Sequence, residues 1–185
     1  MYDIIVLSGI SGAGKSYFIQ HAIEKYDWLC QIPSVTTREV RDGIDETATR
    51  VFVDERSFDD EKKKGNLLFS NTIYGRKYAY RKLDILNSIQ AGKTVILDMK
   101  LDAVKDVRDV FPKTFCIYIK VKLQDIKKEI GLERNNLELR MEDAAEEQRK
   151  VDTIPAFAEK ADIIFENTMD WDSVDRFMDL ISMLR

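Results

Sequence analysis

The first residues that could do chemistry form a glycine-rich loop near the start of the chain. Residues 9–16 read G-I-S-G-A-G-K-S, a complete G-x-x-x-x-G-K-[ST] phosphate-binding motif. The apolar run at residues 4–7 before it is typical of a buried strand, and apolar residues recur at helical spacing after it. Lys15 would then reach the β- and γ-phosphates of a nucleoside triphosphate, and Ser16 would ligate Mg²⁺. The residues predicted to bind ATP are Gly9, Ser11, Gly12, Ala13, Gly14, Lys15 and Ser16.

An acidic residue, Asp98, ends a second apolar run at residues 95–97. In proteins with a phosphate loop, an acid at the carboxyl end of a neighbouring strand can position Mg²⁺ or its water ligands. The alternative interpretation is a cap for the helix that follows. Because the phosphate loop is intact, we favour the first interpretation. We predict Mg²⁺ as cofactor, held by Ser16 and Asp98.

Arginines at two other places could bind phosphate groups. Arg38 and Arg41 stand three residues apart, and two guanidinium groups from one loop could clamp a phosphate. Arg134 and Arg140 flank a polar segment at residues 131–139 that could be a lid, where they would neutralise charge when the site closes. The alternatives are solvated surface arginines for the first pair and ion pairs along an exposed helix for the second.

The elements that must position these residues follow an alternating pattern. Apolar runs at residues 4–7, 94–97, 115–119 and 163–165 are each followed by a segment of helical periodicity. This alternation predicts an α/β fold in which helices cover both faces of a parallel sheet. The stretch at residues 32–80 has short strand-like runs instead and predicts a small β-rich lobe, inserted into a core of residues 1–31 and 81–185. Asp170 or Asp172 would cap the last helix.

Composition limits the function classes. The chain has 185 residues, 44% of them hydrophobic and 34% charged, which is typical of one globular domain. Its formal net charge of -4 argues against a general nucleic-acid or membrane-surface role. Cys30 and Cys116 have no metal-ligand spacing, which favours a reducing, cytoplasmic compartment.

The chain resembles the guanylate kinase family over nearly its whole length. Residues 8–16 are similar to that family's phosphate loop, and residues 34–43, S-V-T-T-R-E-V-R-D-G, are similar to its acceptor-binding segment. The spacing matches without gaps to about residue 103, after which the lid is shortened. Further similar segments lie at residues 74–78, 91–98 and 140–144.

The resemblance implies a three-layer α/β/α core with a five-stranded parallel sheet, an acceptor-binding lobe and a lid. It implies that ATP donates its γ-phosphoryl group to the phosphate of an acceptor. By position, Ser34 and Tyr78 join Arg38 and Arg41 in holding that acceptor, and Asp98 serves either Mg²⁺ or the acceptor. The residues we predict to act in catalysis are Lys15, Arg38, Arg41, Arg134 and Arg140.

Four positions of the predicted acceptor site depart from the family's pattern. Phe69 stands where the family has a guanine-reading glutamate, and Tyr80 stands where it has a small hydroxyl residue. Because phenylalanine cannot accept a hydrogen bond from guanine, we predict weak or no GMP activity. Arg50 replaces a tyrosine and Lys100 an acid, which favours a more anionic acceptor. The aromatic residues would either stack on a base or sugar or fill a smaller pocket.

We therefore predict a cytoplasmic, Mg·ATP-dependent phosphotransferase of the guanylate kinase type, acting as a monomer or homodimer without nucleic acid or membrane. A nucleoside monophosphate is the favoured acceptor. One alternative is a sugar-phosphate kinase similar to ribose 1,5-bisphosphokinase. Another is a catalytically silent module similar to the guanylate-kinase-like domains that bind phosphopeptides.

Overall fold

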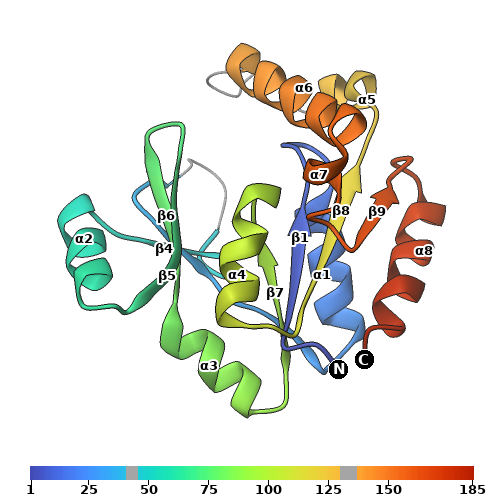
Figure 1. Ribbon diagram of the computed structural model, residues 1–185. Coiled ribbons are helices and arrows are strands. Elements are labelled where there is room, and N and C mark those ends of the chain that lie inside the picture. Colours follow the sequence, from blue (N-terminus) through green and yellow to red (C-terminus); the bar gives the residue numbers. More distant parts are fainter. Residues whose placement is uncertain (41–45, 130–136) are drawn as a thin grey trace. The chain divides into compact units, whose positions relative to one another are not determined.

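The apolar runs form the strands of a five-stranded sheet. The structure is a computed structural model that describes residues 1–40, 46–129 and 137–185. The strand order is β2-β7-β1-β8-β9. Figure 1 shows β7, β1, β8 and β9 side by side in this order. The members are β1 (Ile4–Ser8), β2 (Leu29–Gln31), β7 (Thr94–Asp98), β8 (Thr114–Lys120) and β9 (Ile163–Glu166). β1 pairs in parallel with β8, and β8 pairs in parallel with β9, so the predicted α/β fold with a parallel sheet is confirmed.

The central strand β1 is buried along its whole length, as expected for a strand with both faces covered. The backbone N–H of Met99 donates to the carbonyl oxygen of Leu7 at 3.1 Å. This bond joins the carboxyl ends of β7 and β1. The phosphate loop begins at the carboxyl ends of these strands, which is where parallel α/β sheets bind ligands.

Six α-helices and one 3₁₀ helix accompany this sheet in the described part of the chain. They are α1 (Lys15–Lys25), η1 (Leu101–Ala103), α4 (Val104–Val110), α5 (Leu123–Glu129), α6 (Leu137–Thr153), α7 (Pro155–Ala158) and α8 (Trp171–Ser182). Phe18 of α1 stacks on Phe177 of α8 with ring centroids 4.5 Å apart, and Phe165 of β9 lies edge-on to both rings. This aromatic cluster holds the two helices side by side (Figure 1). Asp170 accepts a hydrogen bond from the N–H of Ser173 at 2.9 Å, so Asp170 is the cap of the last helix.

A second, four-stranded sheet has the order β4-β3-β6-β5. Its strands are β3 (Ser34–Thr36), β4 (Arg50–Phe52), β5 (Leu67–Ile73) and β6 (Arg76–Arg81), and α2 (Glu55–Lys63) and α3 (Lys82–Gln90) accompany them. One face packs on α2 through a cluster of Val35, Phe58, Leu67 and Ala79. The predicted β-rich segment is therefore a sheet with one apolar face.

The chain divides into two compact units, Met1–Asp27 with Ile96–Arg185, and Trp28–Val95. The predicted lobe of residues 32–80 lies within the second unit, which also contains β2 and α3. The predicted lid at residues 131–139 falls mostly outside the described residues. No helix in the described ranges is long and apolar enough to cross a membrane.

Candidate active site

The phosphate loop joins β1 to α1, and its backbone requires glycine. Gly9, Gly12 and Gly14 have φ values of 142°, 83° and 85°, a region that residues with side chains avoid. A Cβ atom on Gly9 would lie 2.6 Å from the carbonyl oxygen of Ile119, and one on Gly14 would lie 2.9 Å from Nδ2 of Asn167. The glycines therefore allow both the turns of the loop and its close approach to the ends of β8 and β9.

Lys15, the first residue of α1, folds back over the loop. Its Nζ donates hydrogen bonds to the carbonyl oxygens of Gly9 at 2.7 Å and Ile10 at 3.1 Å. It also lies 3.8 Å from Oδ1 of Asp98, and its side chain is only 12% exposed. The ammonium group thus sits against the loop and the end of β7, where it can pair with a bound phosphate.

The amino end of α1 adds positive potential to the loop. Its N-cap, Gly14, provides no side-chain hydrogen bond, and the first turn holds no acidic residue. The partial positive charge of the helix end and its first N–H groups therefore remain available to an anion. Ser16 follows Lys15 in this first turn, as the motif predicts.

Ser16 and Asp98 supply a hydroxyl and a carboxylate, which are the oxygen ligands that Mg²⁺ prefers. Asp98 is partly buried and close to Lys15, which places its carboxylate beside the phosphate loop. Among the described residues no group of three or more His, Cys, Asp and Glu side chains could hold a metal by itself. Such a sparse donor set suits Mg²⁺, which keeps several waters and binds through substrate phosphates. The metal role of both residues stays a prediction.

Asn167 is a residue of this site that the sequence analysis missed. It is 6% exposed and follows the end of β9. Its Nδ2 donates to the carbonyl oxygen of Ala13 at 3.0 Å, and its Oδ1 accepts from the N–H of Met169 at 2.9 Å. Its own N–H donates to the carbonyl oxygen of Lys120 at 2.8 Å. The signal that singled out Asp98, a polar residue just after an apolar strand, would have found Asn167 as well.

A buried polar cluster lies near Lys15 and was not predicted either. Glu147 of α6 interacts electrostatically with Lys15 and Lys100 and forms a hydrogen bond with Tyr118 of β8. Burial raises the pKa of Glu147, although both lysines oppose this effect. Oε1 of Glu147 and Oγ of Ser8, which is the register partner of Tyr118, are buried without hydrogen-bond partners. No local motif marks Glu147, because its position depends on how α6 packs.

Strand register brings several predicted acceptor residues together on the second unit. Ser34 pairs with Arg50 of β4 on one side and with Tyr80 of β6 on the other. Residues directly opposite each other in neighbouring strands point to the same face of a sheet. Tyr78 points to this face as well, because it lies two residues from Tyr80 and side chains alternate along a strand. This acceptor face, defined by Ser34, Arg50, Tyr78 and Tyr80, is opposite the face that packs on α2. Their role as acceptor ligands stays a prediction.

Arg38 follows β3, and contacts with two other side chains orient its guanidinium group. Its Nη2 lies 2.5 Å from Oε2 of Glu46, and its guanidinium carbon lies 5.7 Å from the centre of the Phe52 ring. The Arg38 and Glu46 side chains are each 15% exposed. An ion pair and a cation–π contact thus orient a guanidinium group that retains further donors for an anion.

Phe69 occupies an irregular point of β5. The pairing of β5 with β6 shifts register between Leu68 and Asn71, and Phe69 has a φ of 56°. Such a bulge redirects a side chain relative to the regular strand. Phe69 is partly buried there.

The side chains of three predicted arginines lie outside the described part of the structure, and their roles stay predictions. Arg41 and Arg134 lie outside the described residues. Arg140 falls within the backbone range of α6, and its side chain is not described. Lys100 follows β7 and is exposed, and its role toward an acceptor also stays a prediction.

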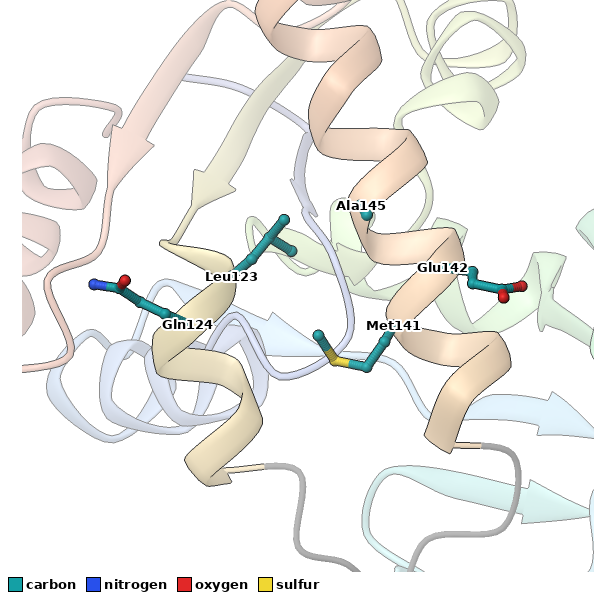
Figure 2. Close-up of a pocket in the computed structure, with 5 residues that line it drawn as sticks. All are labelled: Leu123, Gln124, Met141, Glu142 and Ala145. Atoms are coloured by element: carbon teal, nitrogen blue, oxygen red, sulfur yellow. The ribbon is translucent and has the colours of Figure 1, made fainter.

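An open groove of about 470 Å³ lies between α5 and α6. Figure 2 shows Leu123 and Met141 pointing into the space between the two helices. The remaining lining residues are Gln124, Glu142 and Ala145. None of them belongs to the predicted site.

Comparison with known proteins agrees with the motif and the fold. A family model described as guanylate kinase matches residues 1–182. The chain belongs to the guanylate kinase family. Similar curated proteins include the guanylate kinases of Trichormus variabilis, 31% identical over 116 residues, and of Helicobacter pylori, 30% identical over 128 residues. These matches cover 63% and 69% of this chain, and 58% and 62% of the length of the two relatives.

Two solved structures share the fold. Guanylate kinase from Anaplasma phagocytophilum has a TM-score of 0.70 at 18% identity, covering 98% of this chain and 82% of that chain. Shikimate kinase from Bacteroides thetaiotaomicron has a TM-score of 0.50 at 12% identity, covering 98% of this chain and 97% of that chain. Membership of the guanylate kinase family thus rests on the sequence, and the two structures add agreement in fold.

Proposed function

We propose that this chain is a Mg·ATP-dependent phosphotransferase of the guanylate kinase type, with a nucleoside monophosphate as the favoured acceptor. The observation that carries the proposal is the geometry of the phosphate loop. Lys15 lies against Gly9, Ile10 and Asp98 at an uncapped helix end. A scaffold module that only binds phosphopeptides would have no use for this arrangement.

In the proposed reaction, an oxygen of the acceptor phosphate attacks the γ-phosphorus of ATP, and the bond to the β,γ-bridging oxygen breaks to release ADP. The loop N–H groups and Lys15 bind the triphosphate and offset its negative charge. The chain's own residues contribute orientation and charge neutralisation, without a covalent intermediate on the protein. Ser16 and Asp98 would hold Mg²⁺, which supplies further charge neutralisation when bound.

Arg38 is our proposed ligand of the acceptor phosphate, together with Arg41. Its pairing with Glu46 and its contact with Phe52 orient it before any acceptor arrives. Pre-orientation lowers the entropy lost when the acceptor binds. We expect weak GMP activity, because Phe69 offers no hydrogen-bond acceptor to guanine.

A sugar-phosphate acceptor is the second candidate. The observation in its favour is Arg50, whose Nη1 donates to the carbonyl oxygen of Thr49 at 2.9 Å and which lies beside Ser34. Such a guanidinium group could bind the second phosphate of a sugar bisphosphate product.

The test is an ADP-release assay with ATP, Mg²⁺ and a panel of nucleoside monophosphates and sugar phosphates. We expect release that depends on one acceptor class and is abolished by Lys15→Ala. Acceptor-dependent release that survives Lys15→Ala, or no release with any acceptor, would contradict the proposal.

A further inference from the structure

The acceptor face of the small sheet carries two buried oxygen atoms without hydrogen-bond partners. One is Oγ of Ser34, a residue that is 3% exposed, and the other is Oδ1 of Asn71. Asn71 lies opposite Tyr78 in the pairing of β5 with β6, and Tyr78 lies opposite Thr36 of β3. This register places Asn71 on the same face as Ser34.

Neither Ser34 nor Asn71 belongs to the apolar cluster that packs the sheet against α2. The opposite face is filled by apolar side chains against α2. A buried oxygen without a partner costs free energy, and native proteins keep few of them. Two on one face, both on strands that carry predicted acceptor residues, indicate that a bound molecule provides the missing hydrogen bonds.

The width of the sheet indicates the size of that molecule. Arg50 lies on β4 at one edge and Asn71 lies on β5 at the other, with β3 and β6 between them. Three strand spacings amount to about 14 Å. A phosphate near the arginines and a group near Asn71 are therefore separated by the span of a phosphate, a sugar and a base.

The amide of Asn71 also indicates what it can bind. A side-chain amide offers one acceptor beside one donor, and so pairs with a base edge that has a donor beside an acceptor. The N1–H and O6 of hypoxanthine and guanine form such an edge. A glutamate can instead accept from both N1–H and the 2-amino group of guanine. Phe69 cannot do this, so the 2-amino group loses the partner that the family's pattern provides.

We propose that Asn71 determines acceptor specificity by pairing with the base edge of a nucleoside monophosphate, and that the 2-amino group of guanine is not recognised. This inference rests on the proposed function and deepens it, since it assigns the base-reading role to a residue outside the family's pattern. Ser34 donates or accepts the second hydrogen bond to the same ligand.

The matched probes are IMP and GMP, which differ only in the 2-amino group. For the wild-type chain we expect weak activity with both nucleotides, and kcat/KM values within about threefold of each other. Asn71→Ala should lower kcat/KM for IMP by about tenfold because KM for IMP rises, whereas KM for ATP should stay unchanged. Asn71→Asp should raise the ratio of GMP to IMP by about tenfold, because a carboxylate accepts from both N–H groups.

Thr72→Ala is the control, because Thr72 is the next residue of β5 and is exposed on the other face. If Asn71 had a purely structural role, removing its side chain would lower the melting temperature of the chain. We expect Asn71→Ala to leave the melting temperature unchanged. Titration calorimetry with IMP measures binding without turnover. If IMP binds in an Asn71-dependent manner but no phosphate is transferred, the proposed function fails and the specificity inference stands.

Three results would overturn the inference. The first is an Asn71→Ala variant whose kcat/KM and affinity for IMP stay within twofold of wild type. The second is an equal loss in Thr72→Ala. The third is a wild-type chain that phosphorylates ribose 5-phosphate but neither binds nor phosphorylates any of GMP, IMP, AMP, CMP and UMP. In that case the phosphotransferase proposal stands and the specificity inference fails.

Discussion

The side-chain amide of Asn167 donates a hydrogen bond to the carbonyl oxygen of Ala13 at 3.0 Å, across 154 residues of sequence. This bond connects the segment after β9 to the middle of the phosphate loop. The same Nδ2 atom would lie 2.9 Å from a Cβ atom on Gly14. Asn167 therefore fixes the loop from the side of the sheet.

Asn167→Ala should weaken ATP binding. The Ala13 carbonyl would lose its partner in a buried place, at a cost of about 1–3 kcal/mol. We expect KM for ATP to rise by about tenfold or more, with a smaller change in KM for the acceptor. Titration of a fluorescent ATP analogue measures the effect directly. Unchanged affinity in a folded variant would show that the loop keeps its shape without this bond.

Gly14→Ala should reduce both stability and ATP binding. A side chain at a φ of 85° costs about 1–2 kcal/mol, and the new Cβ atom would also collide with Asn167. Gly92→Ala is the matched control, because its φ is 77° and its Cβ atom would meet nothing within 4 Å. Urea denaturation should show a larger loss for Gly14→Ala. Equal losses would mean that Asn167 moves aside.

Lys15→Ala should lower kcat by about a hundredfold or more, because one charged donor to the transferred group disappears. The side chain is packed over its own loop, so its removal should leave the fold intact by circular dichroism. Lys25→Ala, at the exposed end of the same helix, is the control and should behave like wild type. Comparable turnover in the two variants would contradict the assigned role.

Arg38→Ala should raise KM for the acceptor by about tenfold or more, while KM for ATP changes little. The reason is the loss of an oriented guanidinium group that Glu46 and Phe52 hold in place. Arg76→Ala removes a more exposed arginine paired with Glu39 and should leave both KM values unchanged. Steady-state kinetics with each substrate varied in turn separates the two effects, and a rise in KM for ATP alone would be inconsistent with an acceptor ligand.

Glu147→Gln should change how stability depends on pH. Burial raises the pKa of Glu147 in the folded chain above its unfolded value. The folded state then binds the proton more tightly, so stability falls as pH rises from the unfolded pKa to the raised folded pKa. The variant lacks this loss of stability. The melting temperature of the variant minus that of wild type should therefore increase as pH rises from 4.5 to 8. A constant difference across that range would show that the carboxyl does not titrate abnormally.

Local sequence predicted the phosphate loop, four strands of the large sheet and the final helix. These features are encoded within a few neighbouring residues. A buried strand needs a short continuous apolar run, and the loop needs glycines at fixed spacing before Lys15 and Ser16. Asp98 was predictable for the same reason, since it is the last residue of β7 and the phosphate loop also begins at the carboxyl ends of the strands.

Tertiary structure alone decided which distant residues meet. Asn167 reaches Ala13 because β9 and β1 belong to one sheet. Glu147 of α6 forms a hydrogen bond with Tyr118 of β8, although the two residues belong to different elements. The row formed by Arg50, Ser34 and Tyr80 depends on strand register, and a shift of one residue would turn every side chain to the other face. Sequence determines local chemistry here, whereas register and packing set the hydrogen bonds that position it, because those energies depend on contacts between segments far apart in the chain.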